Sequence, residues 1–293
     1  MTRTADVRTL AIADLESAFA LSSASGWNQR LADWRMLLTL APSGSFAAVG
    51  GGRIVGTAVA IDYGTFGWIA MMLVDPAWRG RGVGARLLEE AIRAMPNRKP
   101  IRLDATPLGR PLYRRHGFED ETTITRYVAV PSSHRGDRKA DQGLPAIRRM
   151  AAADLADVFA ADEPVFGARR RGLLEWLLNG APQYANVIER AGGAAYCFGR
   201  PGRLFDQIGP VVAANDESAR ALVAASAAAA EDRAVVVDAF DRDSGFTAWL
   251  RRCGFTADRP LFRMCRPGSD GAPVIEASGQ SFRELAILGP ELG

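Results

Sequence analysis

The sequence predicts a mixed α/β protein with two tandem domains, each with a mixed, mostly antiparallel sheet, one βαβ crossover and flanking helices. Three observations lead to this fold class: an internal repeat, apolar segments linked as hairpins, and a single amphipathic helix between two later apolar segments. A chain of 293 residues has room for two ordinary domains. With 48% hydrophobic and 24% charged residues, its composition is that of a folded protein.

The repeat consists of four blocks of matching residues that occur twice in the same order. They are Asp14-Leu15 with Asp154-Leu155, Leu37-Leu38 with Leu177-Leu178, a block from Pro76 to Asp104-Ala105 with Pro210 to Asp238-Ala239, and "RRHGF" at 114–118 with "RRCGF" at 251–255. The offset is 140 in the first two blocks, then 134, then 137. We therefore predict a first domain at 1–130, a polar linker at 131–144, a second domain at 145–267 and a C-terminal tail at 268–293.

The first copy predicts, in chain order, a strand at 7–10, helices at 13–21 and 30–40, strands at 46–49, 54–61 and 66–74, a helix at 83–95, a strand at 101–105, a short helix at 111–116 and a closing pair of strands within 118–130. Asp14 suits the first turn of the first helix, and Pro42 ends the second. The run of glycines at 50–52 indicates a hairpin turn. In the helix at 83–95, Leu87, Leu88 and Ala91 keep the spacing of one buried face.

Composition excludes several classes of function. A formal charge of +3 is too small to indicate nucleic-acid binding, and no segment is apolar enough over about 20 residues to span a membrane. Two histidines, and three cysteines without a C-x-x-C pair, predict free thiols and no metal site. The N-terminus has no apolar signal core, so we expect a cytoplasmic protein. Nothing in the sequence indicates the oligomeric state.

The segment Gly80-Arg81-Gly82-Val83-Gly84-Ala85 raises two interpretations. It fits G-x-G-x-x-A, the fingerprint of an NAD(P)-binding fold, with the acidic residue Asp104 downstream. In that fold, however, the glycines follow the first strand, whereas here hairpin-linked strands precede them. The alternative is an anion site, in which backbone N–H groups converge at the start of a helix and Arg79 and Arg81 add positive charge. A turn without a ligand is the third possibility.

Two motifs resemble the GNAT acyltransferase superfamily. Arg79-x-x-Gly82-x-Gly84, after a strand that ends "LVDP", is similar to the family's R/Q-x-x-G-x-G/A loop, and Tyr113-Arg114-Arg115-His116-Gly117-Phe118 is similar to its Y-x-x-x-G-F segment. The predicted order of elements also matches the GNAT fold. The motifs cover residues 5–130, and the resemblance extends over about 145–267 only through the repeat.

The resemblance implies an N-acetyltransferase that moves an acetyl or other acyl group from acetyl-CoA to a small-molecule primary amine, by direct attack and without a metal. Residues 79–85 (Arg79, Gly80, Arg81, Gly82, Val83, Gly84 and Ala85) would bind the pyrophosphate of the cosubstrate. Backbone groups of Leu73 and Val74 would bind its pantetheine arm and the thioester carbonyl, in a gap between two diverging strands. Tyr113 would act as the general acid, or alternatively be a core aromatic. Thr106 stands where the family often has Asn.

Two further residues have open roles on the acceptor side. Asp104 alternates with Leu103 and Ala105 along its strand and so faces the other way. It would act as the general base or anchor the ammonium group, or else be a structural carboxylate, as its recurrence at Asp238 suggests. Trp27, at the joint of the first two helices, would line the acceptor pocket or belong to the core.

The second copy has lost these features. With the offset of 134, residues 79–84 correspond to 213–218, "AANDES", which has neither arginine nor glycine, and Tyr113 corresponds to Leu250. Carboxylates at Asp216 and Glu217 would repel a pyrophosphate. We expect one active site, in the first domain. A non-catalytic acyl-CoA-binding regulatory module remains the alternative, because it needs the loop but not Tyr113.

Overall fold

The computed structural model describes residues 5–96, 99–131, 147–190, 193–269 and 282–293. The first half contains, in order, β1 (Asp6–Thr9), α1 (Leu15–Ala24), α2 (Leu31–Leu40), β2 (Ser45–Gly50), β3 (Arg53–Asp62), β4 (Gly67–Val74), α3 (Val83–Arg93), β5 (Ile101–Ala105), α4 (Arg110–Arg115) and β6 (Glu119–Ala129). This order confirms the predicted fold class.

The second half repeats the arrangement and adds one strand. It contains β7 (Arg148–Arg149), α5 (Leu155–Phe166), α6 (Arg171–Gly180), β8 (Asn186–Arg190), β9 (Gly193–Arg200), β10 (Asp206–Ala213), α7 (Asp216–Ala228), β11 (Val235–Phe240), α8 (Ser244–Arg252), β12 (Thr256–Arg266) and β13 (Arg283–Ile287). The added strand, β13, lies in the segment that the sequence predicted to be a tail.

All these strands form one sheet in which the two halves exchange a strand. The order is β1-β2-β3-β4-β5-β12-β6-β11-β13-β10-β9-β8-β7. The first half's β5 pairs with β12 of the second half, and the second half's β11 pairs with β6 of the first. The registers are equivalent, because Ile101 pairs with Arg266 as its counterpart Val235 pairs with Ala129. At the centre, Ile124 pairs with Leu261, its own counterpart in the repeat. An approximate two-fold axis therefore crosses the sheet there.

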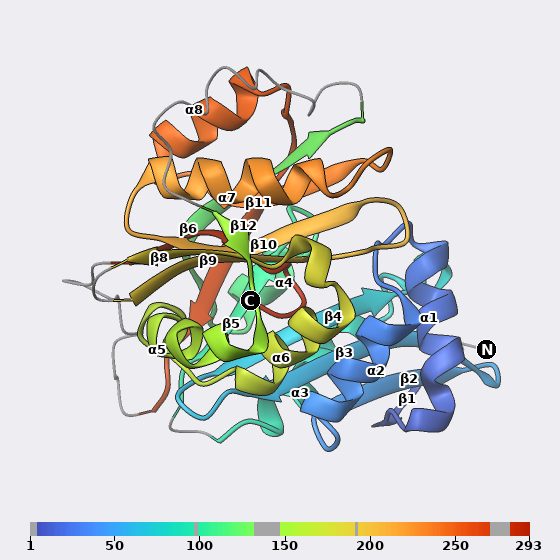
Figure 1. The fold of residues 1–293 in the computed structure, drawn as a ribbon. Coiled ribbons are helices and arrows are strands. Elements are labelled where there is room, and N and C mark those ends of the chain that lie inside the picture. The colour runs from blue at the N-terminus through green and yellow to red at the C-terminus, as the bar shows by residue number, and fades with distance from the viewer. Residues whose placement is uncertain (1–4, 97–98, 132–146, 191–192, 270–281) are drawn as a thin grey trace.

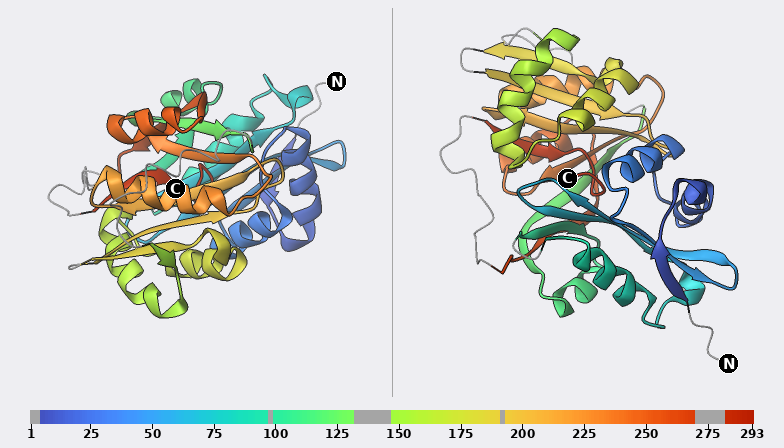
Figure 2. Two further views of the ribbon diagram at one scale, coloured as in Figure 1. Left: turned by 45° about the horizontal axis from the view of Figure 1, so that its top comes forward. Right: turned by 90° about the horizontal axis from the view of Figure 1, so that it is seen from below.

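The helices divide the sheet into an inner and an outer face. On the outer face, α3 and α4 cover one core in the first half, and α7 and α8 cover another in the second. On the inner face, α1 and α2 share a single core with α5 and α6, to which Trp34, Trp68, Phe166 and Leu292 belong. The two halves thus face each other across their inner sides, with the C-terminal end of the chain between them (Figures 1 and 2).

Two sequence expectations need correction. The closing pair of strands within 118–130 is one long strand, β6, because the segment has no turn residue and pairs along its length with β11 and β12 of the other half. The match of Pro76 with Pro210 is not structural, since Pro76 follows β4 and Pro210 lies within β10. The residues 131–144 proposed as a linker lie, after Pro131, outside the described residues.

The structure also describes the three cysteines and the length and hydropathy of the helices. Cys197, Cys253 and Cys265 are free thiols, as the sequence predicted. Among the described residues, no helix has both the length and the apolar character needed to cross a membrane.

Candidate active site

The loop between β4 and α3 has the backbone of an anion-binding turn. Gly80 and Gly82 have φ angles of +73° and +77°, which glycine adopts without steric cost. Within the described chain, no backbone carbonyl accepts a hydrogen bond from the N–H groups of Gly80, Arg81 or Gly82. The first N–H groups of α3, which begins at Val83, are unpaired by helix geometry. Together with the helix dipole, these donors suit a phosphate group.

The side chains around this loop add positive charge. Arg79 and Arg81 are both exposed. The Arg79 Nε donates to the carbonyl oxygen of Val74 at 3.1 Å, so its guanidinium lies at the end of β4. The Arg81 guanidinium lies 5.4 Å from the ring centre of Trp78. A Cβ at Gly84 would lie 3.5 Å from the Leu112 side chain, so the first turn of α3 packs closely against α4.

The strands β4 and β5 diverge next to this loop, as the family resemblance implied. Among the described residues they pair only at Gly67 with Ile101 and at Trp68 with Arg102. Leu73 and Val74, near the end of β4, pair with β3 on one side and have no strand partner on the β5 side in the described part of the chain. Their backbone edge therefore borders a gap, which we call the first gap.

A β-bulge in β4 changes the direction of the backbone beside the first gap. Met71 has a φ of +51°, which is rare for a residue other than glycine, and the register with β3 shifts at this point. The buried Thr57 hydroxyl donates to the Met71 carbonyl at 2.8 Å and holds the bulge in place. Strained backbone of this kind is often found at functional sites. Met71 was not a candidate from the sequence, since no glycine or proline marks the position.

Tyr113 lies on the outer side of β5, within the core beneath α3 and α4. It is 8% exposed, and its ring packs edge to face against Phe118 at 6.0 Å between centres. Burial raises the pKa of the Tyr113 hydroxyl well above its ordinary value, so the group keeps its proton at neutral pH. The neighbouring Thr106 hydroxyl accepts a hydrogen bond from the N–H of Gly109 at the start of α4.

Asp104 faces the inner side of the sheet, where it forms a buried ion pair with the exchanged strand. Arg263 of β12 donates to both of its carboxylate oxygens at 2.9 Å. The counterpart pair, Arg126 of β6 with Asp238 of β11, has the same forked geometry at 2.8 and 2.7 Å. Each pair joins a domain to the strand it receives. This arrangement favours the structural role of Asp104 over that of a general base.

Arg263 is a residue that the sequence did not single out. Its guanidinium lies 4.9 Å from the ring centre of Trp68 on β4, so it reaches from β12 across β5 to the base of the first gap. The available signal was the repeat itself, because Arg126 and Arg263 are 137 positions apart, the offset of the last block. The sequence alone did not show that the strands carrying them are exchanged.

Trp27 is partly buried in the joint between α1 and α2, where the second half holds the chain in place. Its carbonyl oxygen accepts a hydrogen bond from Arg203 at 3.1 Å, and its side chain packs on the shared inner core. The next residue, Asn28, accepts hydrogen bonds from the N–H groups of Leu204 and Phe205 and donates to the Phe205 carbonyl. The connection between α1 and α2, which the sequence analysis expected to lie near the acceptor pocket, is thus in contact with the second half.

The corresponding loop of the second half is shortened as well as changed in composition. Eight residues, Asp75–Gly82, separate β4 from α3, whereas only Ala214 and Asn215 separate β10 from α7. The Asn215 side chain caps α7 by accepting from the N–H of Ser218. Leu250, the counterpart of Tyr113, is a fully buried core residue. Among the described residues, the first half therefore combines an open anion loop, a gap and a tyrosine, and the second half does not.

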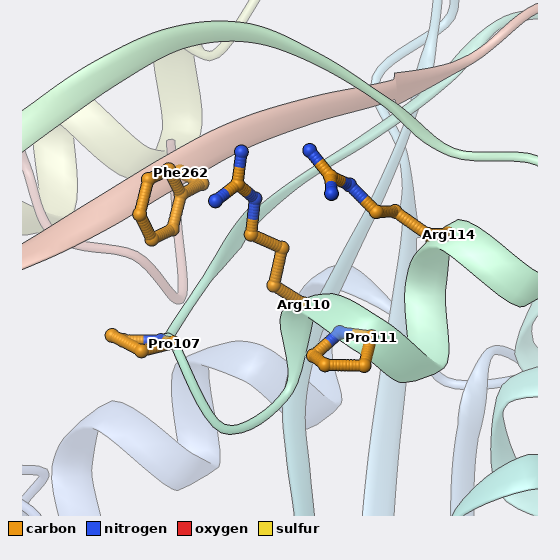
Figure 3. A pocket seen from close by; sticks show the side chains of 5 residues that line it. All are labelled: Pro107, Arg110, Pro111, Arg114 and Phe262. Carbon is orange, nitrogen blue, oxygen red and sulfur yellow. The ribbon is translucent and has the colours of Figure 1, made fainter.

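A small pocket of about 260 Å³ lies beside α4, lined by Pro107, Arg110, Pro111, Arg114 and Phe262 (Figure 3). Both arginines bind the carboxylate of Asp120, and the Arg110 guanidinium lies 3.9 Å from the ring centre of Phe262. These contacts occupy the charged groups, and we assign the pocket no role. The described residues contain no cluster of histidine, cysteine and carboxylate side chains that would hold a metal ion.

Comparisons with known proteins agree with this geometry. Two family models, both described as an acetyltransferase (GNAT) domain, match residues 42–120 and 158–274. The chain is 26% identical over 273 residues to the holothin acyltransferase of Pseudoalteromonas sp. (strain SANK 73390), covering 92% of this chain and 88% of that protein.

Two solved structures resemble the fold of nearly the whole chain. A putative acetyltransferase from Pyrococcus horikoshii has a TM-score of 0.75 and 20% identity, covering 99% of this chain and 96% of its own. A tandem GNAT protein from the clavulanic acid biosynthesis pathway has a TM-score of 0.61 and 15% identity, covering 92% of this chain and 100% of its own. With one family match in each half, the chain belongs to the GNAT acetyltransferase superfamily as a tandem protein and is an acyl-transferring enzyme.

Proposed function

We propose that this enzyme transfers an acetyl group from acetyl-CoA to the primary amine of a small molecule, in a single active site in the first half. The observation that carries the proposal is the combination of a free N–H loop at the start of α3 with a gap between β4 and β5. The loop suits a pyrophosphate, and the gap suits an extended chain that binds a strand edge. A dinucleotide site is disfavoured, because the loop follows four strands that pair antiparallel, β1 to β4, and not the first strand of a parallel sheet.

The proposed reaction is a direct transfer without a covalent enzyme intermediate. The amine nitrogen attacks the thioester carbonyl carbon, the C–N bond forms and the C–S bond breaks. Backbone N–H groups of β4 near Leu73 and Val74 would stabilise the developing oxyanion. The thiolate of coenzyme A takes a proton from the Tyr113 hydroxyl, which its buried setting keeps protonated. The amine loses its proton to solvent through water, since Arg263 occupies both oxygens of Asp104.

Calorimetry with acetyl-CoA tests the loop assignment. We expect Arg79→Ala to weaken binding about 10- to 100-fold, the cost of about 1.5–3 kcal/mol for a lost hydrogen bond to a charged group. The matched control is Arg93→Ala, at the opposite end of the same helix, which should bind like the wild type. Equal affinity of the wild type and Arg79→Ala would contradict the assignment.

Turnover of acetyl-CoA with a panel of primary amines separates an enzyme from a binding module. We expect Tyr113→Phe to lower kcat by about 10²- to 10⁴-fold with little change in the affinity for acetyl-CoA. Tyr184→Phe, a buried tyrosine of the second half, is the matched control and should retain kcat. If the wild type binds acetyl-CoA and acetylates no amine in the panel, the proposed primary-amine acceptor is wrong. Binding of NADPH in place of acetyl-CoA would contradict both.

A further inference from the structure

The second half has a gap of its own, and the chain fills it. The strands β10 and β11 pair in parallel at Asp206, Gln207 and Ile208, as β4 and β5 do at their first residues. Beyond this point they diverge, and β13 lies between them. Val211, Val212 and Ala213 of β10 are in register with β13, which also pairs with Asp238 and Ala239 of β11. We call this space the second gap.

The backbone of β10 is shaped to admit this strand. Gly209 has a φ of +151°, and a Cβ there would lie 2.0 Å from the carbonyl oxygen of Ile287. Any side chain would therefore displace the end of β13. Gly67 and Asp206 pair with the equivalent residues Ile101 and Val235, so the counterpart of Gly209 beside the first gap is Ala70, which carries a Cβ. The close approach of β13 thus depends on a glycine that the first half does not have.

The loop at the outer end of the second gap carries carboxylates, whereas the loop at the outer end of the first gap carries arginines. In the first half, Arg79 and Arg81 surround free N–H groups. In the second half, the cation is Arg283, the first residue of β13. It donates to Asp243 at 2.8 Å, to Asp216 in the first turn of α7 at 2.6 Å, and to the Ala214 carbonyl at 3.2 Å. The loop before α3 suits an anion, whereas the corresponding loop before α7 binds the Arg283 side chain of the same chain.

The residues after β13 emerge on the inner side and reach the first half. We call residues 288–293 the strap. The Pro290 carbonyl accepts a hydrogen bond from Trp68 Nε1 at 3.3 Å, and the Leu292 carbonyl accepts one from the Tyr63 hydroxyl at 2.8 Å. Leu288 and Leu292 are fully buried. Trp68 stands at the base of the first gap, between the strap and Arg263.

We propose that residues 283–293 act as an internal ligand: β13 permanently occupies the second gap, and the strap that follows it fixes Trp68 as the end wall of the first gap. The second half then binds no acyl-CoA, and its former cosubstrate path supports the first active site. The inference rests on the proposed function. An acyl group that enters the first gap from the outer face meets Trp68 and the strap on the inner side, so the wall favours a short acyl group.

Calorimetry and hydrogen exchange with acetyl-CoA test the first part. We expect one molecule bound per chain. Bound acetyl-CoA should slow amide exchange in β4 and leave residues 284–287 as protected as in the free protein. Two molecules per chain, or faster exchange in 284–287 on binding, would overturn the occupancy of the second gap. If acetyl-CoA does not bind, the proposed function fails, whereas rapid exchange of 284–287 in the free protein would refute the internal ligand by itself.

Acyl-chain selectivity tests the wall. The wild type should bind acetyl-CoA at least about tenfold more tightly than hexanoyl-CoA, the smallest discrimination expected for added methylenes that do not fit. A chain that lacks residues 289–293 should lose most of this preference. The control Arg220→Ala removes an ion-pair partner of Asp216 in α7 and makes no change in the strap, so it should keep the preference. If the shortened chain does not fold, Trp68→Phe removes the donor to Pro290 and makes the wall itself smaller, so it should reduce the preference about threefold. A folded variant with the wild-type preference would refute the wall.

Discussion

Neutralising Asp104 distinguishes a structural carboxylate from a catalytic one, and the repeat supplies the matched control. In Asp104→Asn, the Arg263 guanidinium, whose side chain is 10% exposed, loses its forked partner, and the one ion-pair partner left to it among the described residues is Glu284 at 3.9 Å. Removing one member of a buried ion pair costs about 3–5 kcal/mol, which for a chain of this size lowers Tm by about 10 °C. Asp238→Asn leaves Arg126 in the same situation, so we expect a loss of stability of similar size.

Thermal unfolding followed by circular dichroism gives the stability of both variants, and turnover well below Tm gives their activity. Both should be destabilised, and both should retain kcat within a few fold. Replacing both members of the pair by apolar residues, Asp104→Leu with Arg263→Met, should restore most of the stability, because no buried charge is left alone. If Asp104→Asn alone loses kcat by a hundredfold or more at a temperature where it is folded, the structural interpretation of Asp104 is wrong.

Three other outcomes follow from single contacts. Gly82→Ala places a side chain at a φ of +77°, so it should cost about 1–2 kcal/mol in thermal melts and weaken acetyl-CoA binding in calorimetry, whereas Gly172→Ala, in a helix with open space around it, should do neither. Asn28→Ala should lower Tm and raise KM for the amine more than KM for acetyl-CoA in steady-state kinetics; equal changes in both would contradict a role on the acceptor side. Arg110, with Arg114, lowers the pKa of Asp120 to about 2, so this carboxylate stabilises the fold above pH 4 and the stabilisation disappears as the pH falls towards 2; Asp120→Asn should flatten acid unfolding curves over that interval.

Local sequence signals predicted most elements of the first half, because those signals act over short distances. The glycines at 50–52, the periodicity from Leu87 to Ala91 and the loop at Arg79–Ala85 each determine their own stretch of backbone. The single strand β6 escaped prediction for the opposite reason. The strand β6 is long because it pairs with β11 and β12 of the other half. The alternation of apolar residues around Tyr127 indicates a strand but does not show which strands pair with it.

The candidate site was predictable to the same extent. Motifs in the first half indicated the loop, Tyr113 and the diverging strands. Arg263, Glu284 and the strap lie some 160 or more positions after Asp104, so no local motif places them beside it. The repeat argued against a catalytic Asp104. Its counterpart Asp238 lies in the second half, which has lost the anion-binding loop, so a structural role explains both carboxylates better. No pattern in 268–293 distinguished β13 from a tail, because five residues in a strand between two others carry little sequence signal.

The strand exchange makes this chain the covalent equivalent of a swapped dimer. A fragment that ends near residue 131 would contain β6 but not β12, and the complementary fragment would contain β12 but not β6. Each would expose the edge of β5 or β11 unless its own closing strand turned back to cover it. Two such fragments produced together should therefore assemble into an active pair, and each produced alone should either aggregate or refold as a lone domain without Arg263 or Arg126 in its former place. The two halves are separate in sequence, but each completes the sheet of the other.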